Sequence, residues 1–281
     1  LYRDAALPPL MPVAARPSGG LTATQLKYLA ALFMVVDHVG MLLDPLAACF
    51  GPWEIPRYLL RYLGRLAFPI FAYFAAQGCR KTHDYRGYLL RLGTFGAVTH
   101  AVAYLATGGT SGSVVATFFL AALAICLCRQ LSTWGLKPLG VLAAMGLLLL
   151  ACLLRVDYGW VGVLTVLAVY ACGEDRRRQL LALAGCLLLY YAAGNLWTYW
   201  SPVLGTLGEG GAFFQAEAAA RLPYFQRFYL PHTMLMAGCS LLSLPLLARY
   251  NGQRGNGSRW FFYWFYPGHL VVLYAMSMLL S

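Results

Sequence analysis

Residues 114–128 read VVATFFLAALAICLC, a run without a single charged side chain. Similar runs recur along the chain, of whose 281 residues 60% are hydrophobic and only 11% are charged. Soluble domains carry charge on roughly a quarter of their residues, and a chain this apolar does not stay solvated and disordered. Since about 20 apolar residues in a helix cross a bilayer, the composition predicts an all-α polytopic membrane protein.

We expect nine transmembrane helices joined mostly by short loops. Their ranges are 22–44, 59–79, 87–107, 112–130, 137–154, 158–172, 178–194, 230–250 and 259–280. Residues 1–21, rich in proline, alanine and glycine, are interpreted as a flexible tail, and residues 22–281 as a single domain. Residues 195–229 are expected to form the one long connection, with aromatic side chains that are typical of a short interfacial helix.

The placement of lysine and arginine predicts the orientation, because these residues are retained on the cytoplasmic side. With nine spans, fifteen of the 21 cations fall on the side of the N-terminus; the remaining six are Arg57, Arg61, Arg65, Arg155, Arg221 and Arg227. We therefore expect a cytoplasmic N-terminus and a multi-pass protein of the inner or plasma membrane. This topology explains the net charge of +11 without nucleic acid as a partner, since no basic and aromatic stripe is present.

The eight cysteines do not indicate a metal or redox site. Most lie within apolar runs, where cysteine behaves as a small hydrophobe, and no CxxC pair occurs. The motifs of zinc proteases, serine hydrolases and phosphate-binding loops are also missing. The sequence therefore predicts no metal centre.

Ionisable side chains inside a membrane cost free energy and are candidates for function. Three such clusters fall at one depth near the predicted outer surface, although they belong to different helices. They are Asp37 with His38, then Arg57, Arg61 and Arg65 on one helical face, and finally Arg155, Asp157 and Tyr158. This coincidence of depth favours a functional site over unrelated structural roles.

Adjacent helical residues project about 100° apart, so Asp37 is not expected to orient His38 directly. We expect Asp37 to pair with Arg61 or Arg65, while His38 faces a wet cavity. Asp157 is then the candidate to orient the imidazole or to bind an acceptor amine. Structural alternatives stay open: a packing role for His38, an ion pair that only joins two helices, and an N-cap role for Asp157.

Six short motifs, in order, resemble the TraX family, which is named for the conjugation-system pilin acetylase. They are Thr24-Gln25-Leu26-Lys27 through Asp37-His38-Val39-Gly40, Gly64-Arg65-Leu66-Ala67-Phe68-Pro69-Ile70-Phe71-Ala72, Tyr88-Leu89-Leu90-Arg91-Leu92, Asp157-Tyr158-Gly159-Trp160-Val161-Gly162, Tyr250-Asn251-Gly252-Gln253-Arg254-Gly255 and Phe262-Tyr263-Trp264-Phe265-Tyr266-Pro267-Gly268-His269-Leu270. The resemblance covers about residues 22–280.

The resemblance implies an integral membrane acetyltransferase, similar to the wider group of transmembrane acyltransferases. In that group acetyl-CoA is drawn from the cytosol and the acceptor is modified on the opposite side. The resemblance carries the role of the transferring histidine onto His38, with Asp37 and Arg65 beside it. It also makes His269 a candidate second participant.

Acetyl transfer needs a base, a group that stabilises the tetrahedral oxyanion, and a hold on CoA. His38 suits the first role, because imidazole titrates near neutral pH, and Arg65 or Arg61 suits the second. The predicted cytoplasmic cations Arg80, Lys81, Arg86, Arg254 and Arg259 suit the third, although topology explains them equally well. The acceptor stays open between a protein N-terminus, a sugar and a small amine.

Two other functions are weighed against this interpretation. A transporter would use Asp37, His38 and the arginines as a proton or anion path, but the sequence shows no convincing inverted repeat. A non-catalytic assembly protein of the cell envelope would use the same polar residues to hold its helices together.

Overall fold

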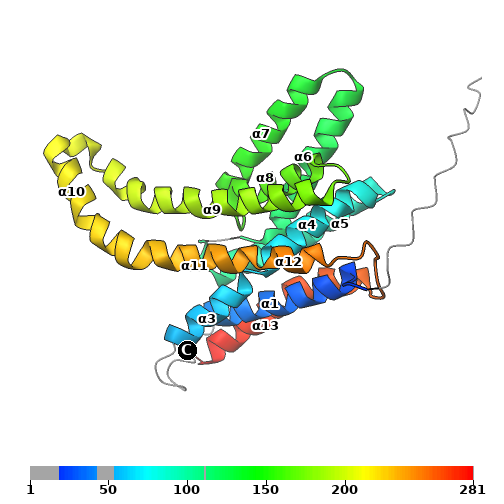
Figure 1. The fold of residues 1–281 in the computed structure, drawn as a ribbon, viewed down its shortest axis with the longest axis horizontal. Coiled ribbons are helices and arrows are strands. Elements are labelled where there is room, and N and C mark those ends of the chain that lie inside the picture. The colour runs from blue at the N-terminus through cyan, green and yellow to red at the C-terminus, as the bar shows by residue number, and fades with distance from the viewer. Residues whose placement is uncertain (1–18, 43–53, 111, 281) are drawn as a thin grey trace, which may run out of the picture.

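The computed structural model describes residues 19–42, 54–110 and 112–280, and it is helical throughout this part of the chain (Figure 1). Most of the predicted tail, residues 1–18, lies outside the described residues. The helices are α1 (Ala23–Leu42), α3 (Glu54–Gly64), α4 (Ala67–Lys81), α5 (Tyr85–Ala106), α6 (Val114–Thr133), α7 (Lys137–Leu153), α8 (Gly159–Ala171), α9 (Arg176–Leu204), α10 (Gly211–Tyr224), α11 (Leu230–Leu241), α12 (Ser243–Ala248) and α13 (Arg259–Leu280), with the short turns η2 (Leu207–Glu209) and η3 (Phe225–Tyr229).

Among the residues that the structure describes, five helical segments are long and apolar enough to cross a membrane. They are Arg57–Lys81, Tyr85–Ala106, Val114–Thr133, Arg176–Glu209 and Gly211–Ala248. Each of the nine ranges expected from the sequence contains a helix. The prediction of an all-helical, multi-pass membrane protein is confirmed, whereas nine spans and a cytoplasmic N-terminus stay predictions.

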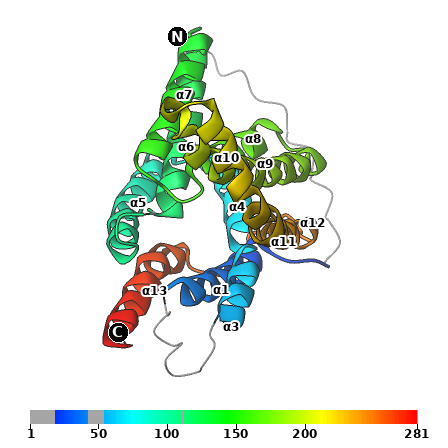
Figure 2. The ribbon, with the colours of Figure 1, turned by 90° about the vertical axis from the view of Figure 1, so that its left-hand side faces the viewer.

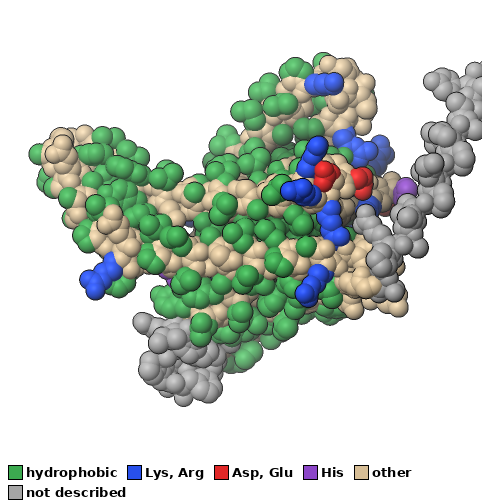
Figure 3. Space-filling model, viewed as in Figure 1, with side chains coloured by type: hydrophobic (Ala, Val, Ile, Leu, Met, Phe, Trp, Pro, Cys, Tyr) green, Lys and Arg blue, Asp and Glu red, His purple; other side chains and the backbone are tan. Residues whose placement is uncertain are grey.

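The outer surface of the helices is apolar, as a lipid environment requires. Leu105, Leu153 and Leu279 are 71%, 70% and 85% exposed. Helices satisfy their own backbone hydrogen bonds, so such side chains can face hydrocarbon at no polar cost. Figure 3 shows an apolar face, with lysine, arginine and acidic side chains gathered at the end where α8 meets α9.

The second predicted helix, 59–79, is wrong in one respect, because it breaks into α3 and α4 at Arg65 and Leu66. Pro69 has no N–H to donate to the carbonyl of residue 65, so an unbroken helix would lack that hydrogen bond. Proline is tolerated in the first turn of a helix, and α4 begins two residues earlier at Ala67. Arg61 and Arg65 nevertheless reach the same oxygen of Asp37 from the two sides of this break.

Residues 195–229 are not the loose connection that we expected. The helix α9 continues to Leu204, and α10 and η3 lead directly into α11. Apolar and alanine-rich sequence sustains these helices, and the glycine-rich stretch 205–211 interrupts them only at the turn. In Figure 1 this helical arm projects beyond the ends of α1 and α3.

Five helices close into a ring, which Figure 2 shows from one end. In order they are α1, α4, α6, α5 and α13, and α13 packs against α1 again. Side chains such as Met34, Phe74 and Phe118 fill the ring as part of the buried core. The ring matters for function because the polar residues of α1 and α13 meet on its inner side.

Candidate functional site

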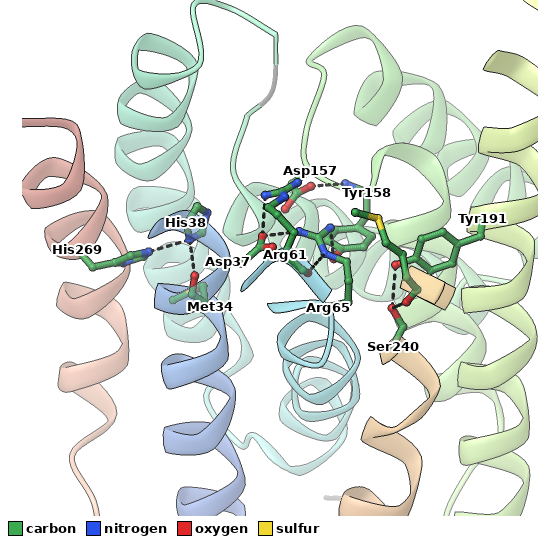
Figure 4. A network of polar contacts seen from close by, with 11 residues as sticks. Met34, Asp37, His38, Arg61, Arg65, Asp157, Tyr158, Tyr191, Ser240 and His269 are labelled. Carbon is green, nitrogen blue, oxygen red and sulfur yellow. Dashed lines mark hydrogen bonds and ion pairs between the residues drawn. The ribbon is translucent and has the colours of Figure 1, made fainter. Parts of the chain in front are cut away.

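The site lies near the C-terminal half of α1, where α1 passes close to the end of α3 (Figure 4). Gly64 makes this approach possible: a Cβ atom at that position would lie 2.2 Å from the Cβ of Asp37. No side chain of normal size fits in that space. A glycine in front of Arg65 therefore brings the carboxylate of α1 against the arginines of α3.

Asp37 forms the predicted ion pairs with both arginines. Its Oδ2 atom accepts hydrogen bonds from Arg61 Nη1 at 3.2 Å and from Arg65 Nη2. Arg65 is 9% exposed, and its Nη1 donates to the hydroxyl of Tyr158 at 3.3 Å. The other carboxylate oxygen of Asp37, Oδ1, is buried and has no hydrogen-bond partner within the described part of the chain.

His38 of α1 meets His269 of the neighbouring helix α13, although 231 residues separate them in the sequence. The Nδ1 atom of His38 lies 2.8 Å from the carbonyl oxygen of Met34 and 3.2 Å from Nε2 of His269. The Nδ1 atom of His269 lies 2.9 Å from the carbonyl oxygen of Phe265. Met34 and His269 thus hold the imidazole through Nδ1, and the expected role of Asp157 in orienting the imidazole or binding an acceptor amine stays a prediction.

Asp157 lies in the turn between α7 and α8, beside the same network. Its Oδ1 accepts from the backbone N–H of Tyr158 at 3.0 Å, and its carbonyl oxygen accepts from the Thr117 hydroxyl at 2.6 Å. The N-cap alternative is wrong, because Tyr158 occupies that position with a φ of 61° and no side-chain cap. Withdrawal from water raises the pKa of Asp157 to about 6, against the opposing charge of Arg65, so this carboxyl exchanges a proton near neutral pH.

Three cavities meet at these residues, and Asp157 lines all of them. The first, of about 190 Å³, is bounded by Asp37, His38, Arg61 and Arg65. A smaller one of about 30 Å³ lies beside Met34, Phe68 and Phe71. The third, of about 560 Å³, is an open cleft whose walls include Arg155, Trp160, Tyr190 and Trp197. The largest of these three spaces therefore borders the polar network at Asp157 and Tyr158.

Sequence reasoning missed several residues that complete the site. Phe68 stacks on the ring of Tyr158, itself a predicted residue, with their centroids 3.6 Å apart, and Tyr191 bonds Ser240 at 2.8 Å beside Arg65. Tyr190 and Tyr266 line the 190 Å³ cavity. In the sequence, the tyrosine and serine residues are marked only by a hydroxyl group inside an apolar run. Such residues are also common in helices that form no functional site.

The predicted CoA-binding cations do not form one group. Arg80 lies 3.7 Å from Glu174, and Lys81 lies over the ring of Tyr250. Arg86 lines a separate cavity of about 300 Å³ between α5 and α6. The carbonyl oxygen of Arg254 accepts a hydrogen bond from the Thr24 hydroxyl at 2.8 Å. The side chain of Arg259 is not among the side chains that the structure describes.

The remaining histidines lie apart from the His38–His269 pair. His232 bonds the Tyr62 hydroxyl at 2.7 Å, and His83 is exposed. His100 accepts from the backbone N–H of Ser113 at 3.4 Å. Within the described residues, no three His, Cys, Asp or Glu side chains are grouped to hold a metal ion.

Comparison with known proteins supplies an independent finding. The profile of the TraX family, described as "TraX protein", matches residues 22–277. A "Probable fimbrial assembly protein FimC, serogroup H1" of Dichelobacter nodosus is 26% identical over an alignment of 279 residues. The match covers 92% of this chain and 97% of that protein. No solved structure matches the chain.

Proposed function

Because the chain belongs to the TraX family, we propose that it is a membrane acetyltransferase that uses acetyl-CoA and modifies an amine or hydroxyl acceptor on the opposite side of the membrane. The observation that carries this proposal is the contact of His38 with His269 at a cavity that also contains Asp37, Arg61 and Arg65. A histidine base beside arginine side chains that are shielded from water suits acyl transfer.

The hydrogen bonds of the two histidines assign their neutral tautomers. Carbonyl oxygens only accept hydrogen bonds, so His269 carries its hydrogen on Nδ1, where it donates to Phe265. His38 likewise carries its hydrogen on Nδ1, which faces the Met34 carbonyl and the free lone pair of His269 Nε2. The Nε2 atom of His38 therefore keeps a lone pair, and this atom is the base in the proposal.

In the proposed reaction, the acceptor nitrogen or oxygen attacks the carbonyl carbon of the thioester while His38 Nε2 removes its proton. The carbonyl oxygen becomes a tetrahedral oxyanion, which a nearby guanidinium stabilises. As the oxyanion collapses, the C–S bond breaks and the CoA thiolate takes the proton from His38. The histidine is then neutral again, ready for the next acceptor.

The two arginines suit different roles. Arg65 is buried, and its terminal nitrogens already bond Asp37 and Tyr158, so it holds the network in place. The side chain of Arg61 is 25% exposed, and its ion pair within the described residues is the one with Asp37, so further N–H groups of its guanidinium can turn to a ligand. We therefore assign oxyanion stabilisation to Arg61 and a positioning role to Arg65.

Asp157 and Tyr190 support an acceptor route from the open cleft. Both residues line this 560 Å³ cleft as well as the 190 Å³ cavity. An acceptor in the cleft thus reaches the polar network by passing Asp157. A carboxylate there attracts an ammonium group and accepts its proton, which is necessary before an amine can attack.

A second candidate, non-catalytic fimbrial assembly, is favoured by the name of the Dichelobacter nodosus relative. In that case the ion pairs of Asp37 would only hold α1 to α3. The polar network alone is compatible with both functions, because buried hydrogen bonds between membrane helices also stabilise a purely structural bundle.

Purified protein in lipid nanodiscs, supplied with acetyl-labelled acetyl-CoA and a peptide or amino-sugar acceptor, tests the choice. Acetyltransferase function predicts release of free thiol in equal amount to the labelled acceptor. Assembly function alone predicts no consumption of thioester and a partner that copurifies in fixed ratio. Absence of transfer to every amine and hydroxyl acceptor offered would contradict the enzymatic proposal.

Replacing His269 tests its positioning role. We expect His269→Leu to lower kcat about tenfold to a hundredfold, because the Nδ1–H of His38 loses one of its two acceptors and only the Met34 carbonyl then orients the imidazole. His269→Gln keeps an acceptor oxygen and should retain most of the activity. Equal losses in the two variants, measured by thiol release, would assign His269 to packing instead.

A further inference from the structure

Lys27 places a positive charge inside the ring, at the opposite end of α1 from His38. Its ammonium lies 5.3 Å from the centre of the Phe74 ring on α4 and 5.9 Å from that of Phe262 on α13. Among the described residues, no carboxylate lies within ion-pair distance of it. Lys27 is thus a half-buried cation whose described contacts are aromatic rather than acidic.

The nearest charge to Lys27 makes its environment more positive. Arg254 is close enough for its charge to act on the Lys27 ammonium. The loop that carries Arg254 is held against α1, because its carbonyl oxygen accepts from the backbone N–H of Thr24 at 3.0 Å and from the Thr24 hydroxyl at 2.8 Å. A half-buried ammonium with no carboxylate near it among the described residues costs free energy, and the neighbouring positive charge of Arg254 adds to that cost. A bound anion would remove that cost.

Lys27 and His38 lie on the same face of α1. Eleven residues at about 100° each return to within about 20° of the starting direction. Both side chains contact α13, Lys27 at Phe262 and His38 at His269. At about 1.5 Å per residue they are separated by roughly 16 Å along the helix, so one extended ligand inside the ring can touch both.

The thioester of CoA has this length and charge. About thirteen bonds join its sulfur to the first phosphorus, and at about 1.2 Å of extended length per bond this arm measures roughly 16 Å. Its far end carries phosphate groups, which are the anions that a lysine binds. The arm itself is largely uncharged and suits the apolar interior of the ring.

We infer that Lys27 binds the phosphate end of the acyl donor inside the ring and so sets the thioester at the height of His38. The inference rests on the proposed acetyl transfer. It assigns the donor site to Lys27, a residue outside the predicted set of CoA-binding cations. Met34, 4% exposed, lies between the two residues beside the 30 Å³ cavity. The arm displaces this flexible side chain on binding.

The test compares two donors that differ only in their phosphates and nucleotide. Wild type, Lys27→Met, Lys27→Arg and the control Lys137→Met are assayed with acetyl-CoA and with acetyl-pantetheine. Lys137 is exposed at the start of α7, away from the ring. We expect Lys27→Met to raise the KM for acetyl-CoA at least about tenfold and to leave the KM for acetyl-pantetheine unchanged. We expect Lys27→Arg to restore most of the affinity for acetyl-CoA.

Equilibrium dialysis with labelled CoA gives a readout that does not depend on turnover. We expect Lys27→Met to weaken CoA binding by the same factor and Lys137→Met to leave it unchanged. Wild-type CoA affinity in Lys27→Met, or equal losses with both donors, would overturn the inference. Lys27-dependent binding without any turnover in the wild type would instead sustain the donor site and contradict the proposed acetyl transfer.

Discussion

The variant His38→Ala is expected to transfer acetyl groups at least about a hundredfold more slowly than the wild type, which is the usual contribution of a positioned base. The loss should appear in kcat, because Nε2 acts on the acceptor proton and has no role in holding the donor. Within the described part of the chain, the hydrogen bonds of the His38 side chain are made through Nδ1, to Met34 and His269. Removal of the imidazole therefore removes the base and leaves the neighbouring ion pairs intact.

Two further variants make this result decisive. His38→Gln keeps most of the side-chain volume and a polar group toward Met34, so a loss of activity in this variant is not a packing effect. His83→Ala removes an exposed histidine at the opposite end of the molecule and should behave as wild type. Thiol release at the wild-type rate by folded His38→Gln would exclude His38 as the base.

The variant Gly64→Ala is expected to destabilise the protein by about 3 kcal/mol and to abolish transfer. A methyl group at this position would lie 2.2 Å from the Cβ and 2.5 Å from the Oδ1 of Asp37, so α1 and α3 must separate. Overpacking alone costs about 1–3 kcal/mol, and a disturbed buried ion pair costs more. Thermal unfolding in detergent and the thiol-release assay measure the two effects.

Gly146→Ala is the matched control. Gly146 lies in the interior of α7, and nothing stands within 4 Å of a Cβ built there. Alanine is the better helix former by about 1 kcal/mol, so this variant should be as stable as the wild type or slightly more so. Wild-type stability of Gly64→Ala would show that the close approach of Asp37 to α3 is not needed for the fold.

Several features of the site were predictable from neighbouring residues in the sequence. Ion pairing of Asp37 with Arg61 or Arg65 follows from their shared depth and opposite charge, since neither charge is stable alone in a membrane. The break before Pro69 also has a local cause, yet the interpretation of residues 59–79 as one helix overlooked it. The resemblance to the TraX family, now shown over residues 22–277, rests equally on local motifs.

Other features depend on contacts between distant segments. No local pattern brings His38 to His269, because their meeting requires α1 and α13 to be neighbours in the ring. The continuation of α9 beyond residue 194 and the helix α10 also differ from the expected connection over 195–229, because alanine and apolar residues sustain helices on both sides of the glycine-rich turn.

Composition and apolar periodicity by themselves determined that this chain folds as membrane helices, because each helix satisfies its own backbone hydrogen bonds wherever the apolar run is long enough. Only the tertiary structure decided which polar side chains share a cavity. Side-chain partners such as His269 for His38, Tyr158 for Arg65 and Thr117 for Asp157 are selected by the packing of whole helices, which no single segment encodes.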